Sequence, residues 1–262
     1  MKDHINLVYT FLRLGILNEF QYRANFFIQL LQTCLQLTVS IGGLAVVFQH
    51  TDNLGGWQAM ELVALLGIYF VVRGAIYTVV SPSLELFMQD VRMGTLDYTL
   101  IKPVDAQFLV SIRRVSVWSS VDFFMGIVII IYALIQLGTT IGVTHLLGFA
   151  ITLLCGGIIV YSFWLVLATC AFWFIKVENI LVIFESMYQA GKWPVTIYPQ
   201  TLQILLTFIV PVAFAVTVPA QALVGQLTLQ NLLVTIVVSM ILFAGSRLFW
   251  MTGIKYYSGA SA

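Results

Sequence analysis

Charged residues are scarce in this chain. Asp, Glu, Lys and Arg together make up 9% of its 262 residues, against about 25% in a typical soluble domain. Three stretches, 24–51, 123–175 and 193–246, contain no charged residue at all. Each is longer than the roughly 20 residues that cross the hydrocarbon core of a bilayer, and the last two are long enough for two crossings. This shortage of charge excludes an ordinary soluble domain and predicts an integral membrane protein.

The apolar stretches also lack the two-residue alternation that is typical of barrel strands. Hydrophobic residues make up 60% of the chain, and the mean hydropathy is +0.99. A chain in lipid has to satisfy its backbone hydrogen bonds internally, which leaves helices or closed barrels. Because continuous apolar runs exclude the barrel, the sequence predicts one all-α transmembrane domain over residues 1–262.

Residues equipped for covalent chemistry are equally scarce. The chain has no GxxxxGK[ST] phosphate-binding loop, and it contains only 3 His and 3 Cys. The Cys residues lie in apolar runs, where small packing roles are usual, and the His residues form no metal-ligand cluster. We therefore expect no catalytic residue, metal site or cofactor on this chain, and no nucleic-acid partner. The energy for any transport would have to come from an ion gradient or from another polypeptide.

The Lys and Arg residues that are present lie on one side of the apolar segments. All 12 except Arg73 fall in the N-terminal arm, in the connecting segments 82–115 and 176–200, or in the C-terminal tail. The intervening connections, near 50–57, 138–146 and 219–230, contain none. Lys and Arg are retained on the cytoplasmic side during insertion. The alternation therefore predicts six spans with both termini in the cytoplasm.

The predicted layout begins with an amphipathic helix at 4–22, within an N-terminal region (1–23) that lies in the membrane interface. This region is too polar for a cleavable signal, so we expect the first span to remain in the mature protein. The six spans are expected at 24–48, 57–80, 116–138, 146–175, 202–217 and 229–250. A cytoplasmic segment (176–200) precedes the fifth span, and a cytoplasmic tail (251–262) follows the sixth.

The fifth predicted span is short and contains a proline. Pro211 lies within it, and Pro219 and Gly225 follow before the sixth span. This punctuation predicts a helix that turns back within the outer leaflet. Non-helical backbone is tolerated at such a depth only where protein or water covers it.

The segment after the second span predicts a short surface helix. Ser81 can act as its N-cap with Pro82 at the first helical position, and Gly94 is placed to end it. Its polar face comprises Glu85, Gln89, Asp90 and Arg92. About three turns cannot span a bilayer, so we expect this helix to lie flat on the cytoplasmic surface. After Pro103, Asp105 can cap a further helix that leads into the third span.

Three segments carry a resemblance to a known family. Residues 91–108, VRMGTLDYTLIKPVDAQF, contain an Arg-x-Gly-x-Leu-Asp…Leu-x-Lys-Pro pattern. Its members are Arg92, Gly94, Leu96, Asp97, Leu100, Lys102 and Pro103. Residues 196–225 add a Tyr-Pro…Thr-Phe…Pro…Pro-Ala pattern, and the tail at 249–261 is also similar. Together they resemble the permease subunits of bacterial ABC transporters of the second exporter type, in the subgroup of about this length.

The resemblance implies six spans, an interfacial N-terminal helix, a cytoplasmic coupling helix between spans two and three, and short outer re-entrant helices before span six. It also implies the inner membrane of a bacterium and a dimer of permeases, like or unlike. Two ATP-binding subunits, which hold ATP and magnesium, would be separate chains. The residues expected to contact them are Glu85, Gln89, Asp90, Arg92, Gly94, Asp97, Lys102 and Pro103. The alternative is an ordinary interfacial helix with a solvated face.

Two ionisable residues lie deep in predicted spans. Arg73 is eight residues before Ser81, roughly 12 Å of helix from the end of span two, and Asp122 lies at a similar depth in span three. An intramembrane Arg usually faces protein or water. The pair can orient two neighbouring helices, or Arg73 can face a cavity and meet an anionic group of a substrate.

The leading hypothesis is the permease subunit of an ABC exporter that works by alternating access, for an unidentified substrate. One alternative is a secondary transporter driven by an ion gradient, although such proteins place ionisable or unwound elements near mid-membrane and few candidates are present. A non-transporting membrane assembly subunit is the third hypothesis.

Overall fold

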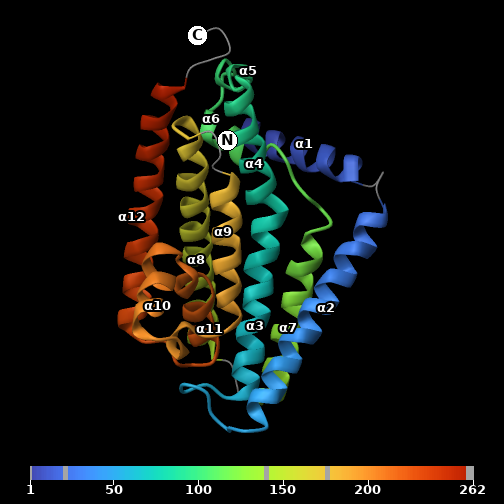
Figure 1. Cartoon of the computed structure of the whole chain (residues 1–262), viewed down its shortest axis with the longest axis vertical. Coiled ribbons are helices and arrows are strands. Elements are labelled where there is room, and N and C mark those ends of the chain that lie inside the picture. Colours follow the sequence, from blue (N-terminus) through green and yellow to red (C-terminus); the bar gives the residue numbers. More distant parts are fainter. Residues whose placement is uncertain (1, 20–22, 139–141, 175–177, 258–262) are drawn as a thin grey trace.

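The computed structural model describes residues 2–19, 23–138, 142–174 and 178–257. The described residues form helices and contain no β-strand. Five helices are long and apolar enough to cross a membrane, and a bent helix pair near the C-terminus can add a sixth. The predicted all-α membrane architecture is therefore confirmed (Figure 1).

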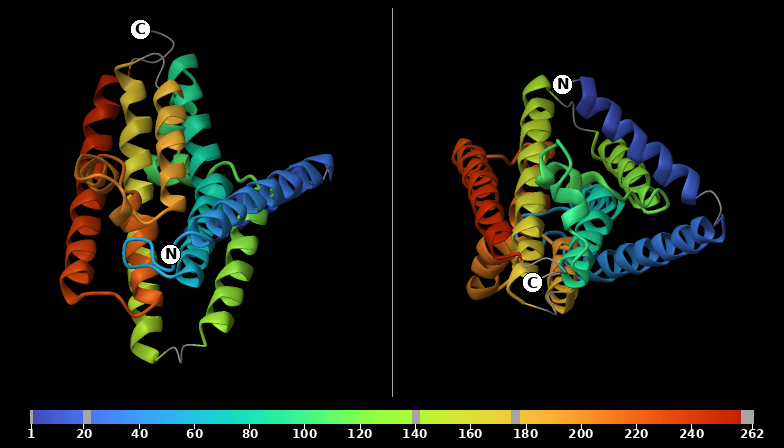
Figure 2. Two further views of the ribbon diagram at one scale, coloured as in Figure 1. Left: turned by 60° about the horizontal axis from the view of Figure 1, so that its bottom comes forward. Right: turned by 90° about the horizontal axis from the view of Figure 1, so that it is seen from above.

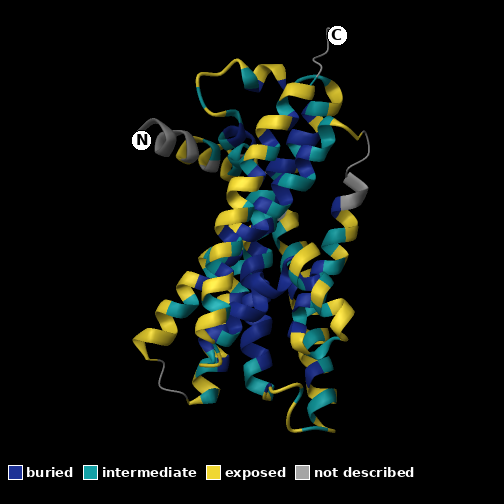
Figure 3. Ribbon diagram, turned by 90° about the vertical axis from the view of Figure 1, so that its left-hand side faces the viewer, coloured by how far each residue is buried: buried dark blue, intermediate teal, exposed yellow. Residues whose placement is uncertain are grey.

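Helix α3 (Ala59–Ala75) is the central element of the bundle. Every residue from Leu62 to Gly74 except Arg73 is buried, and Figure 3 shows this part of the helix as a continuous buried column. It packs most closely on α7 (Ser120–Leu137), because glycines remove side chains from their contact. A Cβ at Gly126 would lie only 2.6 Å from the carbonyl oxygen of Gly67. Small residues let membrane helices approach closely where burial of apolar surface gives no driving force.

The prediction that the helix after span two lies flat on the membrane surface is wrong. A π-helical turn (Ile76–Val80) joins α3 to α4 (Ser81–Met93), and the whole of Ala59–Met93 forms one helix of 35 residues. At 1.5 Å per residue it is about 52 Å long, whereas the hydrocarbon core is about 30 Å thick. The helix therefore projects from the membrane along its axis instead of lying flat on the surface.

Local hydrogen bonding explains why Ser81 and Pro82 do not start a new helix. Ser81 keeps a helical backbone, and its hydroxyl donates to Glu85 at 2.6 Å instead of capping a helix end. Pro82 has no N–H for the carbonyl of Thr78, four residues earlier. That carbonyl accepts the Ser116 N–H at 2.8 Å instead. The wider π turn and this bond from outside the helix accommodate the proline without a break.

The remaining long helices are α2 (Arg23–Phe48), α8 (Val143–Thr169) and α12 (Leu229–Gly253). Helix α2 packs on α3 and α7, whereas α12 packs on α8 at the edge of the bundle (Figure 1). Helix α1 (Lys2–Glu19) runs crosswise to them, as expected for an interfacial helix (Figures 1 and 2). The ends of α4, α8 and α12 meet at one end of the bundle, where Phe87, Phe172 and Trp250 are in ring contact. We call this the terminal end, and the other, which holds residues 49–58, the opposite end.

The expected cytoplasmic segment 176–200 and the expected fifth span at 202–217 are both wrong. Residues 176 and 177 lie outside the described residues, but α9 (Glu178–Tyr188) runs back beside α8 into the bundle (Figure 1). The chain then continues through short 3-10 turns to the opposite end, where Ile197 lies against Gly55. Residues 178–198 therefore make the fifth crossing. On this crossing, Glu185 and Lys192 are partly buried against the bundle instead of lying in a solvated loop.

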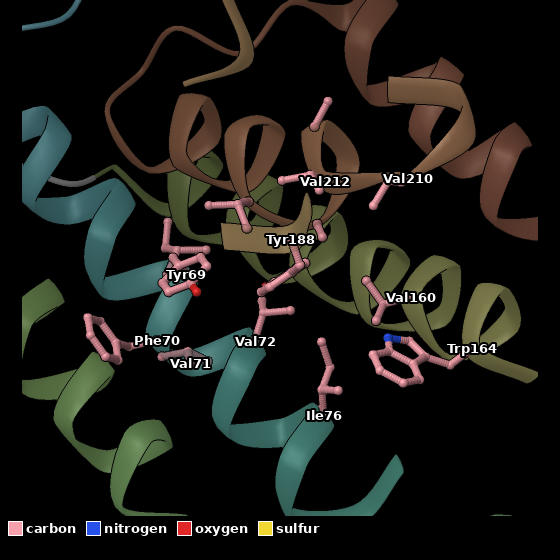
Figure 4. Packing of buried hydrophobic residues seen from close by; sticks show 14 of the residues in the cluster. Tyr69, Phe70, Val71, Val72, Ile76, Val160, Trp164, Tyr188, Val210 and Val212 are labelled. Carbon is pink, nitrogen blue, oxygen red and sulfur yellow. The ribbon is translucent and has the colours of Figure 1, made fainter. Parts of the chain in front are cut away.

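The predicted re-entrant segment follows at the opposite end. Helix α10 (Gln200–Ile204) with a π turn (Leu205–Ile209) enters the bundle, and a π turn (Ala213–Thr217) with α11 (Val218–Leu223) leaves it at a bend of 82°. Pro211 lies in that bend, and Val210 and Val212 beside it face Tyr188 and Val160 (Figure 4).

Of the two residues expected to break the chain after Pro211, one does so and the other does not. Gly225 ends the hairpin with a positive φ of 80°. Pro219, by contrast, lies inside the continuous helix and does not break it as expected, because the preceding π turn leaves room for its ring.

Candidate functional site

The segment that follows α4 forms a compact tip at the terminal end. Gly94 ends α4 in the left-handed conformation, with a φ of 70° that a glycine adopts without strain. A single turn, α5 (Asp97–Leu100), follows it, and then α6 (Ala106–Ile112). Figure 1 shows this tip beyond the other helices. Sequence reasoning placed both Gly94 and the Asp105 cap correctly, since Asp105 accepts the Phe108 N–H at 3.0 Å.

The tip exposes two large apolar side chains. Tyr98 is 72% exposed and Ile101 is 78% exposed. Three residues of the predicted ATPase contact, Asp97, Lys102 and Pro103, are exposed next to them. Apolar groups with charges at their edge are typical of a surface that a partner covers.

Asp90 is not available on this surface, so its expected contact with a partner is wrong. Its side chain is buried, with 7% of the residue exposed, and it forms an ion pair with Arg113. Thr95 Oγ1 donates to Asp90 at 2.8 Å, and Arg113 also donates to Thr99 Oγ1 at 2.9 Å. These bonds join the end of α4 to the turn before α5 and to the end of α6, so Asp90 fixes the shape of the tip.

Glu85 and Gln89 face sideways, toward the bundle. With Arg92 they line a groove of about 370 Å³ between α4, α8 and α9, together with Trp164 and Glu185. The predicted polar face of residues 85–92 is therefore divided between a lateral groove and the base of the tip.

A second network ties α6 to α12. Arg247 donates to Asp105 through both nitrogens, at 3.1 and 2.5 Å, and to Gln107 Oε1 at 2.7 Å. The hydrogen bond from Arg247 lowers the pKa of the Asp105 carboxyl below its usual value. Because α6 ends at Ile112 and α7 begins at Ser120, the expected continuous helix from Asp105 into span three is wrong. The ion pair with α12 holds α6 instead.

Arg73 and Asp122 meet in the middle of the bundle. Arg73 Nη1 lies 3.3 Å from Asp122 Oδ2, and Asp122 is only 1% exposed. Arg73 also donates to Gln36, while Thr33 and Gln29 donate to Asp122. The pair therefore joins α3 to α7, and the polar side chains of α2 attach that helix to both.

Sequence reasoning missed a second group of interacting polar residues, which lies between α3 and α9 and which we call the polar column. Tyr69 stacks on Tyr188, with ring centroids 5.2 Å apart, and the Lys192 ammonium lies 5.7 Å from the Tyr69 ring centre. Tyr77 interacts electrostatically with Glu185. Both charged residues had been expected in cytoplasmic solvent. Their spacing of seven, which puts Glu185 and Lys192 on one helical face with Tyr188 between them, was the signal that could have found the column.

At the opposite end, the re-entrant segment is held by polar contacts. Gln226, next to Gly225, donates to the Glu61 carboxylate at 3.2 Å. Glu61 also accepts the Gln58 N–H at 2.8 Å, so it caps the start of α3. Among the described residues no group of three or more His, Cys, Asp or Glu side chains could hold a metal ion.

Comparison with known proteins agrees with this architecture. The model of the ABC-2 family transporter proteins matches residues 34–261. No curated protein and no solved structure matches the chain. Residues 34–261 hold nearly all of the bundle, including the tip, the ion pairs and the re-entrant hairpin. The chain is thus a multi-pass permease subunit that belongs to the ABC-2 family of membrane transporters, whose members associate with ABC ATP-binding subunits.

Proposed function

We propose that this permease exports a substrate by alternating access, driven by ATP hydrolysis on separate subunits that dock at the tip. The observation that carries the proposal is the exposure of Tyr98 and Ile101 at the end of a single long helix. Docking on Met93–Pro103 would displace α4, and with it α3, because one unbroken helix contains both.

Two ion pairs would distribute that displacement. Asp90 and Arg113 make the tip move as one body with α4, and Asp105 and Arg247 couple α6 to α12. Helices on opposite sides of the bundle would therefore respond to one push.

The proposed assembly contains two ATP-binding subunits and a second permease chain, identical or related. ATP and magnesium belong to the ATP-binding subunits, and this chain contributes no catalytic residue and no cofactor of its own. The contact surface comprises Arg92, Gly94, Asp97, Tyr98, Ile101, Lys102 and Pro103, with Glu85 and Gln89 at its lateral edge.

The proposed orientation puts the terminal end in the cytoplasm of a bacterial cell, with the protein in the inner membrane and both termini cytoplasmic. Among the described residues, Arg13, Arg92, Lys102 and Lys255 all belong to terminal-end segments. The described part of the opposite end contains Asp52 and Glu61 but no Lys or Arg. This asymmetry supports the orientation through the positive-inside rule.

Substitution of the two exposed apolar residues tests the docking proposal. We expect Tyr98→Ser with Ile101→Ser to weaken association with the co-expressed ATPase by at least about 2 kcal/mol, roughly 30-fold, because apolar anchors dominate such interfaces. Tyr256→Ser is the matched control, since Tyr256 is also exposed at the terminal end but lies in the turn after α12, in ring contact with Trp173. Full ATPase binding and full transport by the double variant would contradict the proposal.

One observation favours the ion-gradient alternative. With Glu185 and Lys192 partly buried on the fifth crossing, four ionisable side chains lie between the ends of the bundle instead of two. Such groups are common in proton and ion relays. Transport that stops with an ionophore but survives ATP depletion would establish that alternative, and the reverse pattern would support the ATP-driven exporter. A pull-down in mild detergent that recovers no ATPase, from cells without transport, would indicate an assembly subunit.

A further inference from the structure

A second groove lies beneath the crosswise helix α1. It has a volume of about 690 Å³ and lies between α1, the start of α2, α4 and the connection that follows α6. Its apolar lining includes Phe11, Leu14, Leu86 and Val115. Nothing in the proposed ATP-driven cycle uses this groove.

Both sides of the groove are fixed in place. Gly15 of α1 packs on Val115 so closely that an added Cβ would lie 3.2 Å from the Val115 carbonyl oxygen. Farther along α1, Glu19 accepts the Trp118 N–H at 3.0 Å, and its own carbonyl accepts the Trp118 indole N–H at 3.2 Å. The groove is therefore a preformed feature of the terminal end.

The groove is lined by groups of both charges. Arg113 is committed to Asp90, whereas the neighbouring Arg114 is exposed. Arg114 lies at the border of this groove and of the lateral groove that Glu85 and Glu185 line. The backbone of Arg114 is held from both sides by Ser83 Oγ, which accepts its N–H at 3.1 Å and donates to its carbonyl at 2.6 Å. Glu19, the acidic residue of the groove, uses one carboxylate oxygen for Trp118. A guanidinium and a carboxylate thus line one mainly apolar groove.

The position of α1 gives the depth of the groove. Tyr9, Leu14 and Leu17 on α1 are exposed large side chains, and α1 runs crosswise at the side of the bundle that α2 and α7 form (Figure 2). A crosswise helix with an exposed apolar face lies at the boundary between head groups and acyl chains. Phosphate groups of lipids are found at this depth, and basic pockets between membrane helices bind them.

We propose that this groove binds one phospholipid with a zwitterionic head group that carries a primary ammonium, of the phosphatidylethanolamine type. Arg114 pairs with the phosphate, as its planar fork of donors suits, and Glu19 accepts from the ammonium. The first part of an acyl chain lies against Leu14, Leu86 and Val115. The bound lipid fills the space between α1 and α4, next to the base of the tip.

Native mass spectrometry of the full chain, with lipids added in a neutral detergent, tests the assignment. We expect one phosphatidylethanolamine to be retained in preference to phosphatidylcholine, which has no ammonium N–H, and to phosphatidylglycerol, which has no positive charge. Arg114→Gln should weaken retention of phosphatidylethanolamine by at least about fivefold, the effect of roughly one Arg–phosphate contact. Added inorganic phosphate should not displace the lipid, because it cannot use the apolar part of the groove.

A second substitution separates the two charges. Glu19→Gln keeps an oxygen for the Trp118 N–H but removes the negative charge, so it should abolish the preference for phosphatidylethanolamine while the fold is retained. Lys255→Gln, which removes an exposed positive charge in the turn after α12, is the control and should leave lipid retention unchanged. Equal retention of all three lipids by the unsubstituted protein, or unchanged retention in Arg114→Gln, would overturn the proposal.

Discussion

Breaking the ion pair between Arg73 and Asp122 from one side at a time should give unequal losses of stability. Arg73→Met leaves the Asp122 carboxylate in a site where only 1% of the residue is exposed. Thr33 and Gln29 both donate to Oδ1, so Oδ2 loses Arg73 and has no other hydrogen-bond partner. An uncompensated buried charge of this kind costs about 3–5 kcal/mol.

Removal of the other partner should cost less. After Asp122→Asn, Arg73 keeps Gln36 and its position 5.3 Å from the Tyr77 ring centre, and its side chain is already 17% exposed. A long Arg side chain can also shift toward the membrane interface. We expect a loss of about 1.5–3 kcal/mol, the range for a hydrogen bond to a charged group. Because apolar residues can replace a buried ion pair at little cost, Arg73→Met with Asp122→Leu should return close to the original stability.

Thermal unfolding of the purified protein in one detergent, at one scan rate, measures these differences. A change of 1 kcal/mol moves the Tm by roughly 2–4 °C in a protein of this size. The single variant Arg73→Met should therefore unfold about 6–20 °C lower, and the apolar double variant should unfold within about 4 °C of the parent. If the double variant were as unstable as Arg73→Met, the two charges would not act as a pair. If the double variant were stable but did not transport, Arg73 would have a role in a substrate cavity in addition to orienting the helices.

Three further predictions concern packing, pH and the tip. Gly126→Val should lower the stability by at least about 3 kcal/mol, because the new side chain forces α3 away from α7. Gly157→Val should be tolerated, because a Cβ at Gly157 has no neighbouring atom within 4 Å. The yields of monodisperse protein will distinguish the two variants. Arg247 lowers the pKa of Asp105, so the ion pair between them stabilises the fold above about pH 4 and stops doing so as the pH falls through the lowered pKa. Asp105→Asn should therefore lower the Tm at neutral pH but not at the lowest pH tested. Gly94→Ala places a Cβ at a φ of 70° and should cost about 1 kcal/mol, seen as faster proteolysis at the tip; cleavage equal to that of the parent would argue against a strained turn.

Patterns that act locally predicted much of this fold. The charge-free stretches located α2, α7, α8 and α12 within a few residues, because length and hydropathy suffice to define a spanning helix. The glycine at the end of α4 and the Asp cap of α6 depend on backbone geometry within four residues, and both are present. The depths of Arg73 and Asp122 indicated their pairing, because a charge inside a membrane needs a partner.

The errors came from contacts between segments that are distant in the sequence. The direction of α4 depends on Ser116, which supplies the N–H that Pro82 cannot. The crossing by α9 depends on Tyr69 and Tyr77, which interact with Lys192 and Glu185 and make charged residues acceptable along this crossing. None of these partners is adjacent in the chain, so composition alone assigned the segment to solvent.

The close helix contacts at glycines also depend on partners that are distant in the sequence. Gly67, Gly74 and Gly126 set the approach of α3 to α7, yet they are spaced no differently from other glycines in apolar runs. Gly42 and Gly157, which belong to more conspicuous Gly-Gly pairs, meet nothing within 4 Å. Which glycine is used depends on the partner helix, and a single sequence does not contain that information.

The sidedness of the tip can be measured most directly by labelling single cysteines in intact cells, after replacement of Cys34, Cys155 and Cys170. Tyr98→Cys should resist a membrane-impermeant maleimide until the cells are opened, while Asp52→Cys at the opposite end should react at once from outside. Rapid labelling of Tyr98→Cys in intact cells, with protection of Asp52→Cys, would place the tip where no ATPase could reach it and would contradict the ATP-driven exporter.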